Sequence, residues 1–495
     1  MSIAKRSLSG VLIGAIQFLL TLFQGVILVP IILSNWSESK YGEWLTIYAF
    51  INLMKTLDAG HQIYIANEFT KWYHINKLNA NKKLGSAVRV AFVIGGLEFI
   101  IFILIVFFGF EKTLIGINLN LALKMGIASM LLFWWVFGSV GGIIYKIALP
   151  IGKYNRIVLW GIVNKILEII TISFALHFNL EVGQTFIWLA VVFFVYSVIV
   201  FIDMKKILPE VYPWWQYGSF KEGFIGFRNS IVLTLNSFVE QFSINGMILL
   251  ITNFLNVSMV PVFTTMKTVT NVFLKGNDIV LGPIAPEIIK FHVLKQKEKI
   301  KDIINFNWFL INIVLLIPLI LILPFLENIY LFWTKGTLLF NPVFCYSLVF
   351  SIIIISYGKV LMSYLGGLNH FKALLAINIV RIILLVSIST YLLIVFKSIS
   401  YVGLAICFSE IFASFIIPLI YIKKVLKSDF LSLNLAFPLV SKLILFVYIV
   451  LLMNYEVNIF LLISFFLIII IISLSYEWGK LSSLVKSKII ALISK

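Results

Sequence analysis

"LLISFFLIIIIISL", residues 461–474, contains no charged side chain and only two hydroxyl groups. An earlier stretch, "FIIFILIVFFGF" (99–110), has the same character. Apolar runs of about twenty residues, long enough to cross a bilayer as a helix, recur along the whole chain. The core of a soluble protein does not contain about a dozen such runs. The sequence therefore predicts an all-α integral membrane protein that crosses the bilayer many times.

The overall composition supports this prediction. Of the 495 residues, 61% are hydrophobic and 12% are charged, with a mean hydropathy of +1.05. Soluble domains contain about 25% charged residues. We expect about fourteen transmembrane helices, near residues 9–33, 43–66, 87–110, 121–146, 156–178, 184–204, 223–252, 257–283, 303–325, 341–364, 370–396, 401–422, 434–454 and 457–476. The first is too long for a signal-peptide core and is expected to be an uncleaved span.

Lysines and arginines alternate between the two sides of the predicted bilayer. They collect at the N-terminus and after even-numbered spans, whereas the odd-numbered connections hold only Lys40, Lys112, Lys335 and Lys397. Positive loops stay in the cytoplasm, so both termini are expected there. The same alternation explains most of the net charge of +18. Anionic lipids are therefore the expected partners of this charge, and nucleic acid is not.

No motif in the sequence indicates catalysis. Cys345 and Cys407 both lie in apolar runs, and the five histidines lack metal-ligand spacing. The connections between the spans are short, and they contain neither a Walker loop nor a dinucleotide fingerprint. We expect no enzyme activity, no metal and no cofactor.

An internal repeat organises the chain. A shift of 219 residues aligns "ANEFTKWYHINKL" (66–78) with "APEIIKFHVLKQK" (285–297), and a shift of 216 aligns Lys165 with Arg381. Six spans return the chain to the same side, so the repeat predicts two parallel six-helix lobes, a design used by transporters with the substrate site between repeats. The expected parts are an N-terminal lobe, a cytoplasmic linker, a C-terminal lobe, and two additional helices with a basic tail, at residues 1–204, 205–222, 223–425 and 426–495.

Three stretches resemble the polysaccharide flippases of the multidrug/oligosaccharidyl-lipid/polysaccharide exporter superfamily. "LDAGHQIYIANEFTKWYHINKLNANKKLGSAVRVAF" (57–92) looks like the second span and the basic loop after it. "PVFTTMKTVTNVFLKGNDIVLGPIAPEIIK" (261–290) is similar to the eighth span. "SYLGGLNHFKALLAINIVRIILLVSISTYLLIVFKSISYVGLAICFSE" (363–410) resembles the tenth-to-eleventh connection and the hairpin after it.

This resemblance implies a V-shaped, two-lobed exporter-like fold in the bacterial plasma (inner) membrane. It also implies a substrate: an undecaprenyl-diphosphate-linked oligosaccharide, such as an O-antigen or capsule repeat unit, flipped from the cytoplasmic to the outer leaflet. The implied route is ion-coupled alternating access in lipopolysaccharide or polysaccharide biosynthesis. The implied partners are the polyprenyl-diphosphate-linked glycan, a coupling proton or sodium ion, and a polysaccharide polymerase with its assembly proteins.

Charged residues at membrane depth are functional candidates because they are costly there. At about 1.5 Å per residue, Lys165 lies roughly 14 Å and Arg381 roughly 16 Å into their spans. These two cations, with Lys55 and Lys267, are the expected cavity ligands of the diphosphate. The simpler interpretation of Lys165 is an ion pair with Glu168, three residues later on the same helix face.

The deep carboxylates are candidates for ion coupling, since a coupled transporter needs one whose ionisation changes during the cycle. Glu98, which has no basic neighbour in its own span, is the first choice, followed by Glu240. Asp58 either binds an ion or pairs with Lys55, and the sequence leaves both open. Two further carboxylates, Glu68 and Glu287, are expected at the cytoplasmic mouth.

Two other functions are compatible with parts of this pattern. A multidrug or cation antiporter of the same superfamily would favour carboxylates over the central cations seen here. A membrane glycan polymerase or glycosyltransferase would need a sizeable extramembrane segment with acid, base or metal-binding residues, and none is visible.

Overall fold

The computed structural model describes residue 20, residues 24–73, 75–147, 154–212, 214–368, 370–426, 435–454 and 458–481, and residue 486. In these residues all regular secondary structure is helical, which confirms the predicted fold class. Ten of the described helical segments are long and apolar enough to cross a membrane. The expected first span lies largely outside the described residues, and its described part belongs to a shorter apolar helix, Gln24–Asn35.

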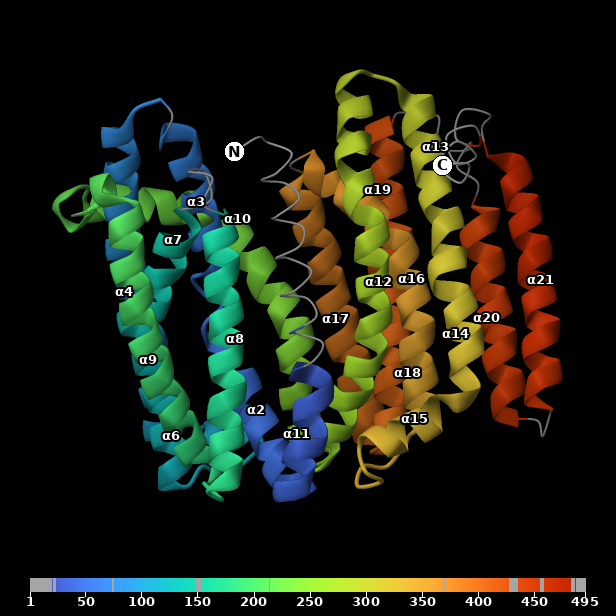
Figure 1. The fold of residues 1–495 in the computed structure, drawn as a ribbon, viewed down its shortest axis with the longest axis horizontal. Coiled ribbons are helices and arrows are strands. Elements are labelled where there is room, and N and C mark those ends of the chain that lie inside the picture. The colour runs from blue at the N-terminus through green and yellow to red at the C-terminus, as the bar shows by residue number, and fades with distance from the viewer. Residues whose placement is uncertain are drawn as a thin grey trace. The chain divides into compact units, whose positions relative to one another are not determined.

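The described chain forms two compact units, residues 1–261 with 333–337, and residues 262–332 with 338–495. The helices of the first unit, labelled in Figure 1, are α2 (Glu38–Met54), α3 (Ala59–Tyr73), α4 (Lys77–Phe107), α5 (Glu111–Ile115), α6 (Leu121–Phe133), α7 (Ser139–Ile147), α8 (Tyr154–His177), α9 (Val182–Ile207), α10 (Phe220–Gln241) and α11 (Met247–Phe254). Within this unit α10 packs on α3 and α4, and α6 packs on α9.

The boundary between the two units lies at Pro261. The seventh predicted span, α10 with α11, belongs to the first unit because glycines allow close contacts there. A Cβ at Gly60 of α3 would lie 2.1 Å from the backbone N of Thr234 in α10. A Cβ at Gly223 of α10 would lie 2.3 Å from the carbonyl O of Ser86 in α4. The division into two six-helix repeat lobes stays a prediction.

The second unit is built around one buried helix. Its helices are α12 (Met259–Val293), α13 (Lys297–Ile311), α14 (Ile317–Ile322), α15 (Leu326–Trp333), α16 (Pro342–Gly367), α17 (Phe371–Phe396), α18 (Ile399–Glu410), α19 (Ile417–Leu426), α20 (Ala436–Asn454) and α21 (Ile459–Lys480). The most apolar window of α16 is 78% buried, whereas that of α21 is 17% buried. The helices α13, α17, α18, α19 and α20 all contact α16, and α21 packs on α14 and α20. The last helix, α21, therefore lies at the edge of this unit.

Polar residues fix where several helices begin. The side chains of Asn76, Asn120 and Asn341 accept hydrogen bonds from backbone N–H groups in the first turns of α4, α6 and α16, at 3.1, 2.9 and 2.8 Å. Such caps satisfy donors that have no partner within the helix. In α16 the cap is followed directly by Pro342, whose ring suits the first helical position.

Several predicted spans are not continuous α-helices. The second is split by turns at residues 55–58 into α2 and α3. Others contain π-helical turns, in which backbone hydrogen bonds join residues five apart. The described π-turns are η1 (Trp134–Gly138), η4 (Phe242–Gly246), η5 (Asn312–Leu316) and η7 (Ile411–Ile416).

Candidate functional site

The break in the second span places a lysine in the interior of the first unit. Lys55 caps the C-terminus of α2, and its Nζ lies 5.3 Å from the ring centroid of Trp134. Among the described residues no carboxylate oxygen lies within 4 Å of this Nζ. A cation over an indole face is only partly compensated for the loss of water. Lys55 therefore lies against an aromatic ring rather than in an ion pair with a described carboxylate.

Asp58 is the last residue of the break, and His61 follows in the first turn of α3. Both side chains are fully buried. Gln62 donates from Nε2 to Oδ2 of Asp58 at 3.0 Å, and His61 Nδ1 lies 3.4 Å from Oγ of Ser230 in α10. The two alternatives for Asp58, ion binding and pairing with Lys55, stay predictions. The side chains of Gln62 and His61 thus contact polar groups of the first unit.

The two other carboxylates considered for ion coupling differ in their surroundings. Glu98 in α4 is 1% exposed, and neither of its oxygens has a hydrogen-bond partner among the described residues. Glu240, near the end of α10, has an exposed side chain. A buried ionisable group without hydrogen-bond partners is costly, which makes it a functional candidate at membrane depth. Glu98 is the stronger candidate of the two.

The repeat-related cation of the first unit is in an ion pair. Nζ of Lys165 lies 3.0 Å from Oε2 of Glu168, as the spacing of three residues indicates. The hydroxyl of Tyr48 in α2 donates to Oε1 of the same carboxylate at 3.0 Å. The charge of Lys165 is therefore already balanced within the unit.

Arg381, its counterpart in the second unit, is balanced in a different way. Its Nε lies 3.0 Å from Oε1 of Glu410, the last residue of α18. Its Nη2 donates to Oγ of Ser414 at 3.0 Å, and Nη1 donates to Asn378. Ser414 in turn donates to Glu410. The guanidinium thus joins α17 to the α18–η7 junction through one connected set of polar groups.

Two other lysines of the second unit resemble Lys55. Nζ of Lys267 in α12 lies 5.3 Å from the ring centroid of Phe263, and Nζ of Lys442 in α20 lies 3.1 Å from that of Phe415. Neither has a carboxylate oxygen within 4 Å among the described residues. Lys442 was missed in the sequence, although it is the one cation within the run predicted as span thirteen.

The predicted mouth residues carry ordinary surface ion pairs. Glu287 lies 3.4 Å from Lys290, and both side chains are exposed. Glu68, beyond the predicted end of its span, lies 2.8 Å from Lys71 and 3.5 Å from Lys83. Burial raises the pKa of Glu68, but these two lysines together outweigh burial and hold its pKa below the usual value.

A second buried polar cluster was not foreseen. Asn312 in η5 donates from Nδ2 to both oxygens of Glu477 in α21, each at 2.8 Å. Its Oδ1 accepts from Ser441 of α20 at 2.7 Å and from Tyr357 of α16. Glu477 was missed because it follows the predicted end of the last apolar run, yet it is 1% exposed. One amide therefore connects both C-terminal helices to the rest of the second unit.

This fold is shared with solved transporters. An inward-facing multidrug resistance MATE family transporter of the MOP superfamily aligns with a TM-score of 0.63 and 13% identity, over 83% of this chain and 96% of its own. The lipid II flippase MurJ, in an inward-closed conformation, aligns with 0.59 and 15% identity, over 97% and 99%. A MOP superfamily transporter from Pyrococcus furiosus, described by the reversed polarity of its binding pocket, gives 0.54 and 13%, over 86% and 95%.

These similarities establish the exporter fold. No protein-family model matches the sequence, and no curated protein is significantly similar to it. The solved structures with this fold include both a drug transporter and a lipid flippase, so the choice between these functions depends on the residues of this chain.

Proposed function

We propose that the protein is a flippase that moves polyprenyl-diphosphate-linked oligosaccharides across the bacterial inner membrane by ion-coupled alternating access. The observation that carries this proposal is a set of three lysines, Lys55, Lys267 and Lys442, that pack on aromatic rings and have no carboxylate oxygen within 4 Å among the described residues. A diphosphate supplies the negative charge that such lysines lack, and a cationic drug does not. Both units have at least one such lysine.

The proposal separates the cations into two groups. Lys55 and Lys267 bind the diphosphate during the transport cycle, while Lys165 and Arg381 remain candidates whose charges are already balanced by Glu168 and Glu410. The proposed transport runs from the cytoplasmic to the outer leaflet, with both termini of the protein in the cytoplasm. On this proposal the cell uses the protein to export O-antigen or capsule repeat units for a polymerase and its assembly proteins.

The coupling carboxylate of this proposal is Glu98, with Asp58 and Glu240 as further candidates. Because neither oxygen of Glu98 has a hydrogen bond among the described residues, it exchanges a proton without disrupting a network. The same observation favours the second candidate function, a multidrug or cation antiporter, because a buried carboxylate also attracts a cation.

The test measures uptake of a radiolabelled undecaprenyl-diphosphate glycan into proteoliposomes of known orientation. We expect wild-type uptake, and its loss in Lys55→Met/Lys267→Met, which removes charge but keeps side-chain length. The matched control is Lys290→Met, since Lys290 is exposed and paired with Glu287. If the wild type ignores the glycan but moves a cationic dye, the antiporter is correct and the lysines do not bind substrate.

A further inference from the structure

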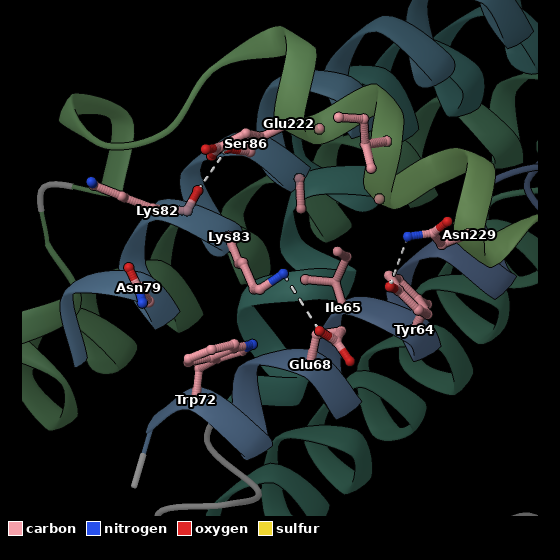
Figure 2. A pocket seen from close by; sticks show the side chains of 14 residues that line it. Tyr64, Ile65, Glu68, Trp72, Asn79, Lys82, Lys83, Ser86, Glu222 and Asn229 are labelled. Carbon is pink, nitrogen blue, oxygen red and sulfur yellow. Dashed lines mark hydrogen bonds and ion pairs between the residues drawn. The ribbon is translucent and has the colours of Figure 1, made fainter. Parts of the chain in front are cut away.

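A polar pocket lies in the first unit between α3, α4 and α10 (Figure 2). Its volume is about 220 Å³. The polar and aromatic side chains that line it include Glu68, Trp72, Asn79, Lys83, Glu222 and Asn229. None of the deep residues described above lines it, so it is separate from the interior cations.

The charges that line the pocket cancel. Glu68 and Glu222 oppose Lys82 and Lys83, and Lys83 is already 3.5 Å from Glu68. Two carboxylates disfavour a phosphate, and two ammonium groups disfavour a cationic drug. Amides, carboxylates and ammonium groups together offer many hydrogen-bond donors and acceptors, which suits an uncharged ligand rich in hydroxyl groups.

Trp72 provides a flat surface at this site. Its indole is partly buried and packs on a core cluster that includes Phe69 and Leu84. Nζ of Lys83 lies 5.9 Å from the ring centroid, and Figure 2 shows both side chains bordering the pocket. Because the core holds one side of the ring in place, little side-chain entropy is lost when a ligand packs against the ring. Pyranose rings have one apolar face of C–H groups that stacks on such a surface.

Small residues and fixed polar groups shape the remainder of the pocket. Gly223 and Gly226 of α10 line it without side chains, and Asn229 Nδ2 donates to the Tyr64 hydroxyl at 3.3 Å. Glu222 accepts from Oγ of Ser86 at 3.2 Å. The volume lies below the roughly 300–1,000 Å³ of drug-sized sites. The pocket therefore has room for one sugar ring rather than for a whole oligosaccharide.

We infer that this pocket binds one uncharged sugar of the transported glycan, stacked on Trp72 and hydrogen-bonded by Glu222, Asn79 and Asn229. This inference rests on the proposed function, since a lipid-linked glycan on the proposed cytoplasmic side supplies the sugar. The pocket then holds the head group by its sugar, while the interior lysines act on the diphosphate. Sugar specificity and phosphate affinity would reside in different residues.

The experiment is saturation-transfer-difference NMR on the full chain in lipid nanodiscs. The probes are the soluble oligosaccharide released from the source cell's undecaprenyl-diphosphate pool, a panel of methyl glycosides, and inorganic diphosphate. We expect at least one sugar probe to bind and Trp72→Ala to weaken it about fivefold. Gly226→Ala is a second variant, because a Cβ there lies 3.5 Å from Ile65, an ordinary contact, and narrows the pocket without strain.

A control variant tests whether a loss of sugar binding is specific to this pocket. Trp215→Ala removes an exposed indole that does not line this pocket and should leave sugar binding unchanged. Absence of sugar binding overturns the inference, and so does equal binding in wild type, Trp72→Ala and Gly226→Ala. Competition by diphosphate overturns it as well, because the pocket would then be an anion site.

The two proposals fail in distinguishable ways. Sugar binding without glycan uptake into proteoliposomes refutes the flippase and retains a sugar site. Glycan uptake that is unaffected by Trp72→Ala and Gly226→Ala, without sugar binding, refutes only the pocket. Binding of the methyl glycosides alone, without the released oligosaccharide, shows that the site serves free sugars and overturns its role in glycan transport.

Discussion

Replacement of Arg381 by Met separates a structural role of this residue from a role in substrate binding. The substitution leaves Glu410 without its cation, at a site where the two side chains are only 13% and 11% exposed. A buried carboxylate deprived of its partner costs about 3–5 kcal/mol. We therefore expect Arg381→Met to lower the free energy of unfolding by about 3–5 kcal/mol. This loss is measured by denaturant titration of the purified protein in mixed micelles.

A double variant tests whether the loss of stability comes from the unpaired carboxylate of Glu410. In Arg381→Met/Glu410→Met no charge remains buried, so at least about 2 kcal/mol of the loss should be recovered. The exposed pair Lys290–Glu287 is the control, and Lys290→Met should change stability by less than about 1 kcal/mol. Glycan transport is then compared between the stable double variant and wild type. Transport by the double variant makes Arg381 structural, and its loss makes Arg381 a ligand.

Two results would contradict this reasoning. A cost below about 1 kcal/mol for Arg381→Met would mean that Glu410 is solvated or protonated in the folded protein. A double variant no more stable than the single one would mean that the hydrogen bonds to Ser414 and Asn378, rather than the ion pair, provide the stabilisation.

Three further predictions follow from the same contacts. Glu98→Gln should keep the melting temperature within about 2 °C of wild type, yet reduce ion-coupled transport; full transport would remove Glu98 from the mechanism. Asn312→Ala should lower the free energy of unfolding by roughly 2–4 kcal/mol, since it removes hydrogen bonds to a carboxylate and two hydroxyls. The control Asn454→Ala, at the exposed end of α20, should change the free energy of unfolding by less than about 0.5 kcal/mol. Equal losses in the two variants would show that the buried cluster adds no stability. Gly60→Val should prevent native packing of α3 on α10, with low yield of monodisperse protein in size-exclusion chromatography, while Gly479→Ala, with open space around its Cα, should behave as wild type.

The helical fold could be predicted from the sequence because apolar runs alone determine it in a membrane. Local pairs could be predicted too, as Lys165 and Glu168 show, since a spacing of three residues places them on one helix face. The pairing of Arg381 with Glu410 could not, because these residues belong to different helices and nothing in their spacing specifies the contact. The same reason hid the contact of Asn312 with Glu477.

The packing of the seventh predicted span illustrates a different limit. Hydropathy shows that α10 and α11 are apolar, but it does not show which neighbours they pack against. That choice depends on small residues such as Gly60 and Gly223, which allow backbone approach only if the partner helix lies opposite them. Glycine positions are visible in the sequence, whereas their partners become visible only in the structure.

The π-turns within the helices give this protein a tolerance that its short connections do not provide. A π-turn is an α-helical turn that has absorbed one extra residue. Deleting one residue inside η5 would restore a regular α-helical turn, and the helix on either side of it would keep facing the same neighbours because the extra residue is taken up locally. The same deletion in regular α-helix would turn every following side chain by about 100° and shift it by about 1.5 Å. Single-residue deletions at the four described π-turns should therefore disturb packing less than deletions elsewhere in the helices, which gives evolution places where the length of a helix can change while its packing face is kept.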